Sequence, residues 1–439
     1  MRILLKNCRP VDPEMEIPER ADLLLEDGRI SQMKTTDNQG DSSAGSAGIE
    51  TLDLKGAYLL PGLIDMHAHF REPGYEERET IRTGSEAAAA GGFTTVAVMP
   101  NTRPVADNPA TIELIKARAA EVPIDITPLG SITKGSAGSE LAEIGFLSQA
   151  GVRGLTDDGQ PVMNSEVMRR AMEYASDFDL PIISHCEDLK LAAEGVMHEG
   201  YYSSILGLKP IPAAAEEIMI ARDIALAELT GARLHIAHLT TSRGLEMVLQ
   251  ARAKGIKVTA EVTPHHLTLT DKAVLGYDTA TKVNPPLRSQ QDLEALQQAL
   301  GQDEIDVIAT DHAPHTVEEK MGTFDSAAFG ISGLETALAV LHQELILADK
   351  LDWKKLVRLM YYNPAEILGL KTSGLEAGSR ADLTVFDPEK KWQVDTGKFK
   401  SLGRHSPYNG WDLTGKVILT IKDGRIIYDD RGDQAEILY

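Results

Sequence analysis

The stretch Pro61-Gly-Leu-Ile-Asp-Met-His-Ala-His-Phe70 begins as an apolar run and ends in polar residues. Apolar, β-branched runs of this kind recur along the chain and alternate with stretches rich in helix-forming residues. There are eight of them: 58–70, 93–100, 124–133, 151–158, 180–187, 232–239, 256–266 and 305–315. Runs that are apolar throughout suit parallel strands buried on both faces. Eight βα units predict an α/β protein with a (β/α)8 TIM-type barrel.

The alternative for such a pattern is an open, doubly wound parallel sheet. That fold is typically marked by a Gly-x-Gly-x-x-Gly loop after a strand or by a Walker phosphate-binding loop. Neither motif follows any of the eight runs. The sequence therefore favours the closed barrel.

The two ends of the chain resemble each other. Leu23-Leu-Leu-Glu-Asp-Gly-Arg-Ile30 and Leu419-Thr-Ile-Lys-Asp-Gly-Arg-Ile426 are both strand patterns around an Asp-Gly turn, a strong hairpin signal. Because an isolated hairpin is only marginally stable, we expect both ends to share one small β-sandwich domain. The predicted division is 1–55 and 371–439 for this domain and 56–370 for the barrel. Residues 38–48, rich in Gly, Ser and Ala, are expected to form a flexible loop.

The amino-acid composition limits the classes of partner and the cellular compartment that are expected. The 439 residues include 44 basic and 66 acidic side chains, a formal net charge of −22. This acidity argues against nucleic acid or an anionic membrane as the main partner. Two cysteines exclude a disulfide scaffold and fit a reducing compartment. With no membrane-spanning run and no signal peptide expected, a cytoplasmic protein is predicted.

Histidines gather where the predicted strands end. Nine of the twelve lie there, all but His198, His342 and His405. Alternate residues of a strand point to the same face, so His67 and His69 can hold one ion. A lone His-x-His pair is more simply explained as two buried, hydrogen-bonded imidazoles. That explanation weakens here, because the same barrel mouth offers His185, His238 and two aspartates. Six such ligands suit two divalent ions bridged by a carboxylate and a water.

Several polar residues remain ambiguous on spacing alone. Either Asp157 or Asp158 could be a ligand, while the other closes the turn before Gly159. His265 and His266 could equally well be packing residues or functional ones, whereas His312, which precedes Ala-Pro, could be structural. Cys186 is expected to be buried rather than reactive. Arg71 could be a surface charge, but at a metal-lined mouth its guanidinium suits a substrate carboxylate.

Several longer motifs resemble those of a known protein family. Pro61-Gly-Leu-Ile-Asp-Met-His-Ala-His69, Ala309-Thr-Asp-His-Ala-Pro-His315 and Asn363-Pro-Ala365 resemble the amidohydrolase superfamily. His67-Ala-His-Phe-Arg-Glu-Pro-Gly74, Gly91-Gly-Phe-Thr-Thr-Val-Ala-Val-Met-Pro-Asn-Thr102 and Asn284-Pro-Pro-Leu-Arg288 are, more narrowly, similar to bacterial class I dihydroorotases. The likeness extends from the first strand to residues 378–383. Several long motifs in the same order make it highly specific.

The resemblance implies a role for each candidate residue. It assigns the first metal ion to His67, His69 and Asp311, the second to His185 and His238, and the bridge between them to Asp158. Hydantoinases and many relatives use a carboxylated lysine as the bridge, so an Asp-Asp-Gly loop favours dihydroorotase. Contacts to the substrate carboxylate are implied for Arg71, Asn101 and His315. Contacts to the substrate ring are implied for Asn284, Phe329 and Gly330.

The implied reaction is the reversible closure of N-carbamoyl-L-aspartate to L-dihydroorotate in pyrimidine synthesis. Two Zn²⁺ ions would serve as cofactors and Asp311 would carry the proton. Residues 316–328 are a candidate lid. The partner is expected to be a small-molecule substrate, and the chain a homo-oligomer. Two other classes stay open: another cyclic-amide hydrolase, and a non-catalytic subunit of an aspartate carbamoyltransferase complex. Retention of all six ligands argues against the second.

Overall fold

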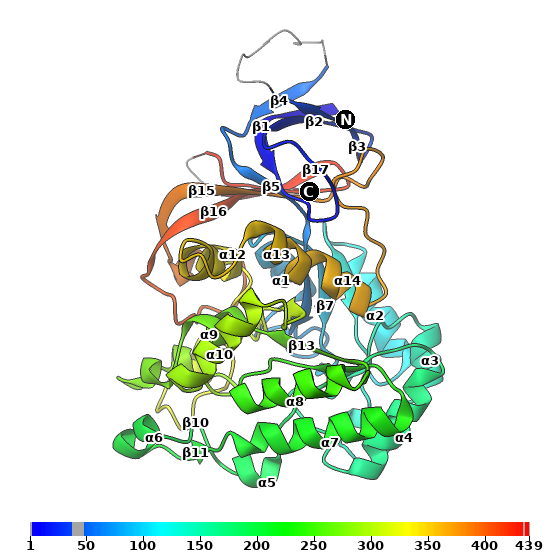
Figure 1. Ribbon diagram of the computed structural model, residues 1–439, viewed down its shortest axis with the longest axis vertical. Helices are drawn as coiled ribbons and strands as arrows, with labels where there is room; N and C mark the ends of the chain where they lie inside the picture. The colour runs from blue at the N-terminus through cyan, green and yellow to red at the C-terminus, as the bar shows by residue number, and fades with distance from the viewer. Residues whose placement is uncertain (1, 37–47, 433–434, 439) are drawn as a thin grey trace.

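The computed structural model describes residues 2–36, 48–432 and 435–438. A sheet built from both chain ends lies at one end of the molecule, and helices surrounding a parallel barrel form the rest (Figure 1). The loop expected at residues 38–48 falls outside the described residues, except for Gly48. No helix within the described ranges is both long and apolar enough to cross a membrane.

The parallel strands close into a ring. Two ladders carry the order β6-β7-β8 and β9-β12-β13-β14. Their bounds are β6 (Leu63–Ala68), β7 (Phe93–Val98), β8 (Asp125–Pro128), β9 (Ile182–Ser184), β12 (Leu234–Ile236), β13 (Val258–Val262) and β14 (Val307–Ile308). Single parallel bridges join the ladders, Gly130 to Leu155, Leu155 to Ile182 and Ala68 to His312. This closure confirms the barrel and rules out the open sheet.

The fourth run differs from the prediction, because only Leu155 within 151–158 pairs as a strand does. The backbone N–H of the next residue, Thr156, donates to the oxygen of Gly130 at 2.9 Å, and beyond it a side chain makes the contacts. Asp157 accepts hydrogen bonds from the backbone of Ile132 and Thr133, at 2.8 and 3.0 Å. The buried carboxylate of Asp157 therefore holds the end of the run 151–158, where a longer ladder of strand pairing was expected.

Helices cover the outside of the ring. The longer ones are α1 (Ile81–Ala90), α2 (Pro109–Ala119), α4 (Ser165–Ser176), α7 (Ala214–Thr230), α8 (Ser242–Ala253) and α10 (Gln290–Gly301). Several start at a side-chain cap: Thr80, Asn108, Asn164, Thr241 and Ser289 each accept a hydrogen bond from the first turn. Shorter helical segments are α3 (Ile144–Gln149), α5 (Leu189–Ala192), α6 (Tyr201–Leu206), α9 (Pro264–Thr268), α11 (Val317–Lys320), α12 (Ala337–Leu341), α13 (Trp353–Val357) and α14 (Asn363–Ile367). They fill the loops around the barrel.

Apolar side chains fill the interior of the ring. Met66, Ala97, Leu129, Ile183, Ala237 and Val307 belong to one buried cluster, together with Ile367 and Leu368. Because this packed layer leaves no room for solvent, polar groups collect beyond it at the carboxyl ends of the strands.

A buried carboxylate ties the first barrel strand to the last. Asp65 of β6 accepts from the Thr310 backbone at 3.0 Å and from the Thr310 hydroxyl at 2.5 Å. It also accepts from the backbone N–H of His67, at 3.2 Å. These bonds hold the ends of β6 and β14 side by side, where the ladders themselves contribute only one bridge.

Strands from both chain ends form one nine-stranded sheet in the order β18-β17-β16-β15-β5-β1-β2-β3, with β4 paired to β1. They are β1 (Arg2–Pro10), β2 (Ala21–Glu26), β3 (Arg29–Thr35), β4 (Glu50–Asp53), β5 (Tyr58–Pro61), β15 (Leu383–Gln393), β16 (Asp412–Lys422), β17 (Arg425–Asp429) and β18 (Glu436–Ile437). The shared β unit of the two ends is therefore present. Its form as a sandwich and the boundaries at 55/56 and 370/371 stay predictions.

The two Asp-Gly turns meet in this sheet. Gly28 and Gly424 both have left-handed backbones, with φ of 82° and 71°. A Cβ atom on Gly424 would lie 2.8 Å from the Cα of Gly28, closer than two such atoms can approach. Glycine is therefore required by the contact as well as by the turn.

Candidate metal centre

Six predicted ligands come together at the carboxyl ends of the barrel strands. His67 and His69 lie on or just after β6, His185 follows β9, His238 follows β12, and Asp311 follows β14, while Asp158 ends the fourth run. All six are buried, and none is more than 8% exposed. Residues far apart in the sequence thus share one water-poor site.

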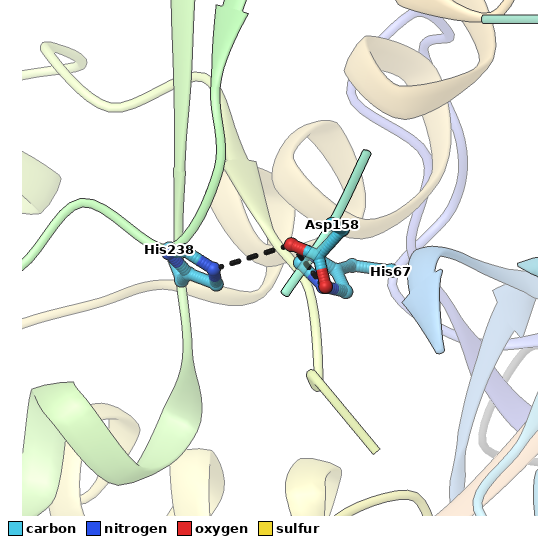
Figure 2. A group of neighbouring side chains, drawn as sticks. All are labelled: His67, Asp158 and His238. Carbon is cyan, nitrogen blue, oxygen red and sulfur yellow. Dashed lines mark ion pairs between the residues drawn. The ribbon is translucent and has the colours of Figure 1, made fainter. Parts of the chain in front are cut away.

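Asp158 lies at the middle of the group. Its Oδ1 atom stands 3.5 Å from Nε2 of both His67 and His238 (Figure 2) and 3.6 Å from Nδ1 of His185. Its Oδ2 atom is 3.4 Å from Nε2 of His69. One carboxylate therefore faces all four predicted histidine ligands.

Asp311 approaches the same site from the eighth strand. Its Oδ1 atom is 3.1 Å from Nε2 of His69 and 3.5 Å from Nε2 of His67. Two overlapping groups have donor atoms close enough for one ion each: His67, Asp158 and His238, and His67, His69 and Asp311. His238 and Asp311 have left-handed backbones, with φ of 31° and 47°. Such strained conformations in non-glycine residues concentrate at functional sites.

The donor atoms fit a metal ion. Nε2 of His67 and Oδ1 of Asp158 are buried without any hydrogen-bond partner, whereas buried polar atoms in proteins are almost always satisfied. Separations of 3.4–3.6 Å are long for hydrogen bonds but suit two atoms that ligate one ion. Imidazole nitrogens and carboxylate oxygens are the ligands of zinc and similar divalent ions.

The carboxylates also change how the histidines bind protons. Burial alone would lower the pKa of His185, but interaction with the carboxylates of Asp158 and Glu187 outweighs it and raises the pKa to about 10. Burial likewise opposes a charge on His67, yet Glu261, Asp158 and Asp311 hold its pKa well above the usual value. Protons and metal ions therefore compete for these nitrogens.

Arg71 and His315 lie next to each other at the edge of the centre. Nη2 of Arg71 is 3.4 Å from Nε2 of His315, and its Nε donates to the backbone oxygen of Pro314 at 3.3 Å. Burial and the nearby guanidinium lower the pKa of His315 to about 4, so this imidazole is neutral. The side chain of Arg71 is buried, not at the surface.

Asn101 and Asn284 contact ligands or their neighbours. Oδ1 of Asn101 accepts from Nδ1 of His69 at 3.1 Å, so this amide also fixes the orientation of a ligand. Nδ2 of Asn284 donates to Glu187 at 3.1 Å, and Glu187 in turn lies 3.4 Å from Nε2 of His185. Oδ1 of Asn284 is buried without a partner.

Phe329 and Gly330 are placed by two buried lysines. Nζ of Lys320 donates to the backbone oxygen of Gly330 at 2.9 Å, and Nζ of Lys282 lies 4.5 Å from the centre of the Phe329 ring. A Cβ atom on Gly330 would stand 2.6 Å from the oxygen of Ala313, so only glycine fits there. Lys320 also donates to Ala328, and Lys282 to Asp325 and Ala327. Lys282, which lies outside the candidate lid at 316–328, thus holds the end of that segment, while Lys320 belongs to the segment itself. Movement of the lid stays a prediction.

The structure separates the histidines that spacing left ambiguous. His266 lies 2.9 Å from the backbone oxygen of Pro285, and His312 lies 3.3 Å from Glu79 and accepts from Gly333. Both are therefore packed, hydrogen-bonded residues. His265 is buried, and its Nε2 atom has no partner. Cys186 is buried, and its pKa is raised well above the usual value by that burial.

Sequence reasoning overlooked two carboxylates, Glu187 and Glu261. Glu261 accepts from Nδ1 of His67 at 2.5 Å and is fully buried. The available signal was a single acidic residue inside the apolar run 256–266. Glu187 directly follows the His185-Cys186 pair at the end of the fifth run.

Known proteins match this chain in sequence. A family model described as dihydro-orotase-like matches residues 56–244. Two curated relatives named dihydroorotase, from Pelotomaculum thermopropionicum and Syntrophus aciditrophicus, are 51% and 50% identical to this chain. The matches cover 98% of this chain and 99% and 100% of theirs. The chain belongs to the dihydroorotase family.

Two solved structures share the fold of this chain. An L-hydantoinase (dihydropyrimidinase) from Arthrobacter aurescens superposes with a TM-score of 0.86 at 27% identity, covering 100% of this chain and 97% of the other. A dihydropyrimidinase from Brevibacillus agri gives 0.84 at 22% identity, with the same coverage. The dihydroorotase family therefore shares its barrel with enzymes named for other substrates, so the fold alone does not identify the substrate.

Replacing the two adjacent aspartates should have different effects. Asp158→Ala should lose bound metal, because this carboxylate faces four histidines. Asp157→Ala should keep metal and lose at least about 3 kcal/mol of stability, because it leaves three buried donors unpaired at a cost of about 1–3 kcal/mol each. Asp157 accepts from Ser131, Ile132 and Thr133. Metal analysis of both variants measures the bound metal, and urea unfolding measures the free energy of unfolding. A larger metal loss in Asp157→Ala would contradict the assignment.

Affinity for Zn²⁺ should rise with pH. With a pKa of about 10, His185 carries a proton near neutral pH that a metal ion must displace. Each displaced proton makes the apparent affinity rise about tenfold per pH unit until the pH passes that pKa. Competition of the apo-protein with a chromophoric chelator, across roughly pH 6.5–8.5, measures the slope. An affinity that does not change with pH would show that the ligands are already deprotonated.

Proposed function

We propose that this chain is a class I dihydroorotase that catalyses the reversible closure of N-carbamoyl-L-aspartate to L-dihydroorotate and water, in pyrimidine synthesis. The observation that carries the proposal is the aspartate at position 158, among four histidines, in a chain about half identical to proteins named dihydroorotase. By the resemblance, hydantoinases use a carboxylated lysine as this bridge, and a genetically encoded carboxylate in its place favours dihydroorotase.

The proposed cofactors are two Zn²⁺ ions. His67, His69 and Asp311 would hold the first, His185 and His238 the second, and Asp158 would contact both. Such ions lower the pKa of a water molecule to near neutral and polarise a carbonyl oxygen. Burial of all six ligands keeps bulk water away from the reacting groups and strengthens electrostatic interactions among them.

Asp311 is the proposed proton carrier. Its Oδ1 atom faces the nitrogens of His67 and His69, which places the carboxylate where the nucleophile would lie. In the hydrolytic direction Oδ1 or Oδ2 takes the proton of the attacking water and delivers it to the leaving ring nitrogen. In the closing direction the same carboxylate accepts the proton from the ureido nitrogen.

Arg71 would bind the substrate carboxylate that does not react. The neighbouring neutral His315 offers a further polar contact, and Asn101 lies against His69 at the same edge. A charge-assisted, bidentate contact at one end of the substrate orients the reacting end and reduces the entropy cost of reaching the transition state. Asn284, Phe329 and Gly330 are proposed to contact the ring.

We also propose that the protein is cytoplasmic, acts as a homo-oligomer and binds neither nucleic acid nor membranes. The net charge of −22 supports the last two statements. Association with an aspartate carbamoyltransferase is part of this proposal. Light scattering of the purified protein, alone and mixed with that enzyme, tests the assembly.

Substrate choice tests the function directly. Purified protein supplied with Zn²⁺ should hydrolyse dihydroorotate and close carbamoyl-aspartate, with far lower rates on hydantoin and allantoin. Metal-stripped protein should regain activity with Zn²⁺ alone, because an aspartate bridge needs no carbon dioxide to form. Faster turnover of hydantoin, or a requirement for bicarbonate, would overturn the assignment.

Arg71→Lys should lower kcat/KM for dihydroorotate by about 10–100-fold, because lysine keeps the charge but loses the bidentate contact. Bound metal should stay at the wild-type level, since Arg71 is not among the ligands. Steady-state kinetics together with metal analysis measure both quantities. A parallel loss of metal would instead assign Arg71 to the support of the centre.

A further inference from the structure

Glu261 is a carboxylate with no exposed surface, on strand β13 inside the barrel. A charge that has left water entirely needs compensating donors or opposite charge. Residues of two other strands, β6 and β12, supply these partners. Glu261 is not a predicted ligand, and the reaction outlined above does not use it.

Three donors converge on this carboxylate. Oε1 accepts from Nδ1 of His67 at 2.5 Å and from the backbone N–H of His238 at 3.2 Å. Oε2 lies 3.1 Å from Nε2 of His235, whose Nδ1 is 2.8 Å from the hydroxyl of Thr259. A single side chain therefore contacts one residue of each proposed metal site and is itself held by His235.

These contacts decide which nitrogen of His67 faces the metal. An ionised carboxylate can only accept hydrogen bonds, so Nδ1 of His67 must carry the hydrogen. In the neutral imidazole, the form that binds a metal ion, Nε2 then holds the lone pair. It lies 3.5 Å from both Asp158 and Asp311 and has no hydrogen-bond partner.

Charge gives Glu261 a second effect. Asp158 and Asp311 supply two negative charges at the centre, while two divalent ions would bring four positive ones. Glu261 adds a third negative charge, one imidazole away from the first ion. Inside a barrel with little water, interactions between charges are stronger than at the surface.

We propose that Glu261 is a positioning residue of the metal centre, fixing His67 as an Nε2 ligand and raising metal affinity through its charge. The proposal rests on the metal centre of the proposed function, but not on dihydroorotate as the substrate. Buried carboxylates that accept from a ligating histidine commonly change metal affinity or activity by about 10–100-fold when removed.

Glu261→Gln is the informative variant, because the amide oxygen can still accept from His67 while the charge is lost. Its affinity for Zn²⁺ should fall about 10–100-fold in competition of the apo-protein with a chromophoric chelator. Glu79→Gln is the matched control. Glu79 is equally buried and lies 3.3 Å from Nε2 of His312, a histidine outside the predicted ligand set. That variant should bind Zn²⁺ as the wild type does, whatever stability it loses.

Three results would overturn the proposal: wild-type affinity in Glu261→Gln, an equal loss in Glu79→Gln, or a wild-type protein that binds no Zn²⁺. If Glu261→Gln does not fold, nitrogen NMR of histidine-labelled, Zn²⁺-loaded wild type decides. His67 should then show a hydrogen on Nδ1 and metal on Nε2, and the reverse would refute the assignment. Wild-type protein that binds Zn²⁺ but does not turn over dihydroorotate would overturn only the proposed function.

Discussion

The metal centre depends on one buried carboxylate, that of Asp158. Removing a carboxylate from water is costly unless hydrogen bonds or opposite charge compensate it. The four nearest imidazoles stand at 3.4–3.6 Å, too far to satisfy it fully by hydrogen bonding. The cluster therefore leaves buried polar atoms of Asp158 and His67 without hydrogen-bond partners, and a bound cation would compensate them.

The closed barrel is what brings these groups together. Parallel strands all end at the same rim, so ligands from the first, fourth, fifth, sixth and eighth runs meet there. Closure between the first and last strands depends strongly on Asp65, which holds Thr310 and the backbone of His67. The same bonds fix the backbone on which the His67 side chain is positioned. Stability of the ring and geometry of the centre are thus coupled.

Fold and substrate are separate questions for this protein. Structures named hydantoinase and dihydropyrimidinase share the barrel at 22–27% identity. What distinguishes one substrate from another is the chemistry at the rim. The groups proposed to make this distinction here are Asp158, the Arg71–His315 pair, and the backbone around Gly330, which Lys320 holds. The proposed dihydroorotase activity follows from these residues and from the close relatives, not from the barrel.

The sequence by itself determined the barrel, the four histidines and Asp311 at its mouth, while spacing left the choice between Asp157 and Asp158 open. Periodicity and strand ends are local properties, and they suffice to place His67 and Asp311 at one rim. The tertiary structure decided the features that depend on contacts between residues far apart in the sequence. It paired Asp157 with residues 131–133, so that Asp158 is left to face the histidines, and it reduced the fourth strand to a single bridge at Leu155. It also placed Glu261 behind His67, because hydrogen bonds across the barrel form only once the ring has closed.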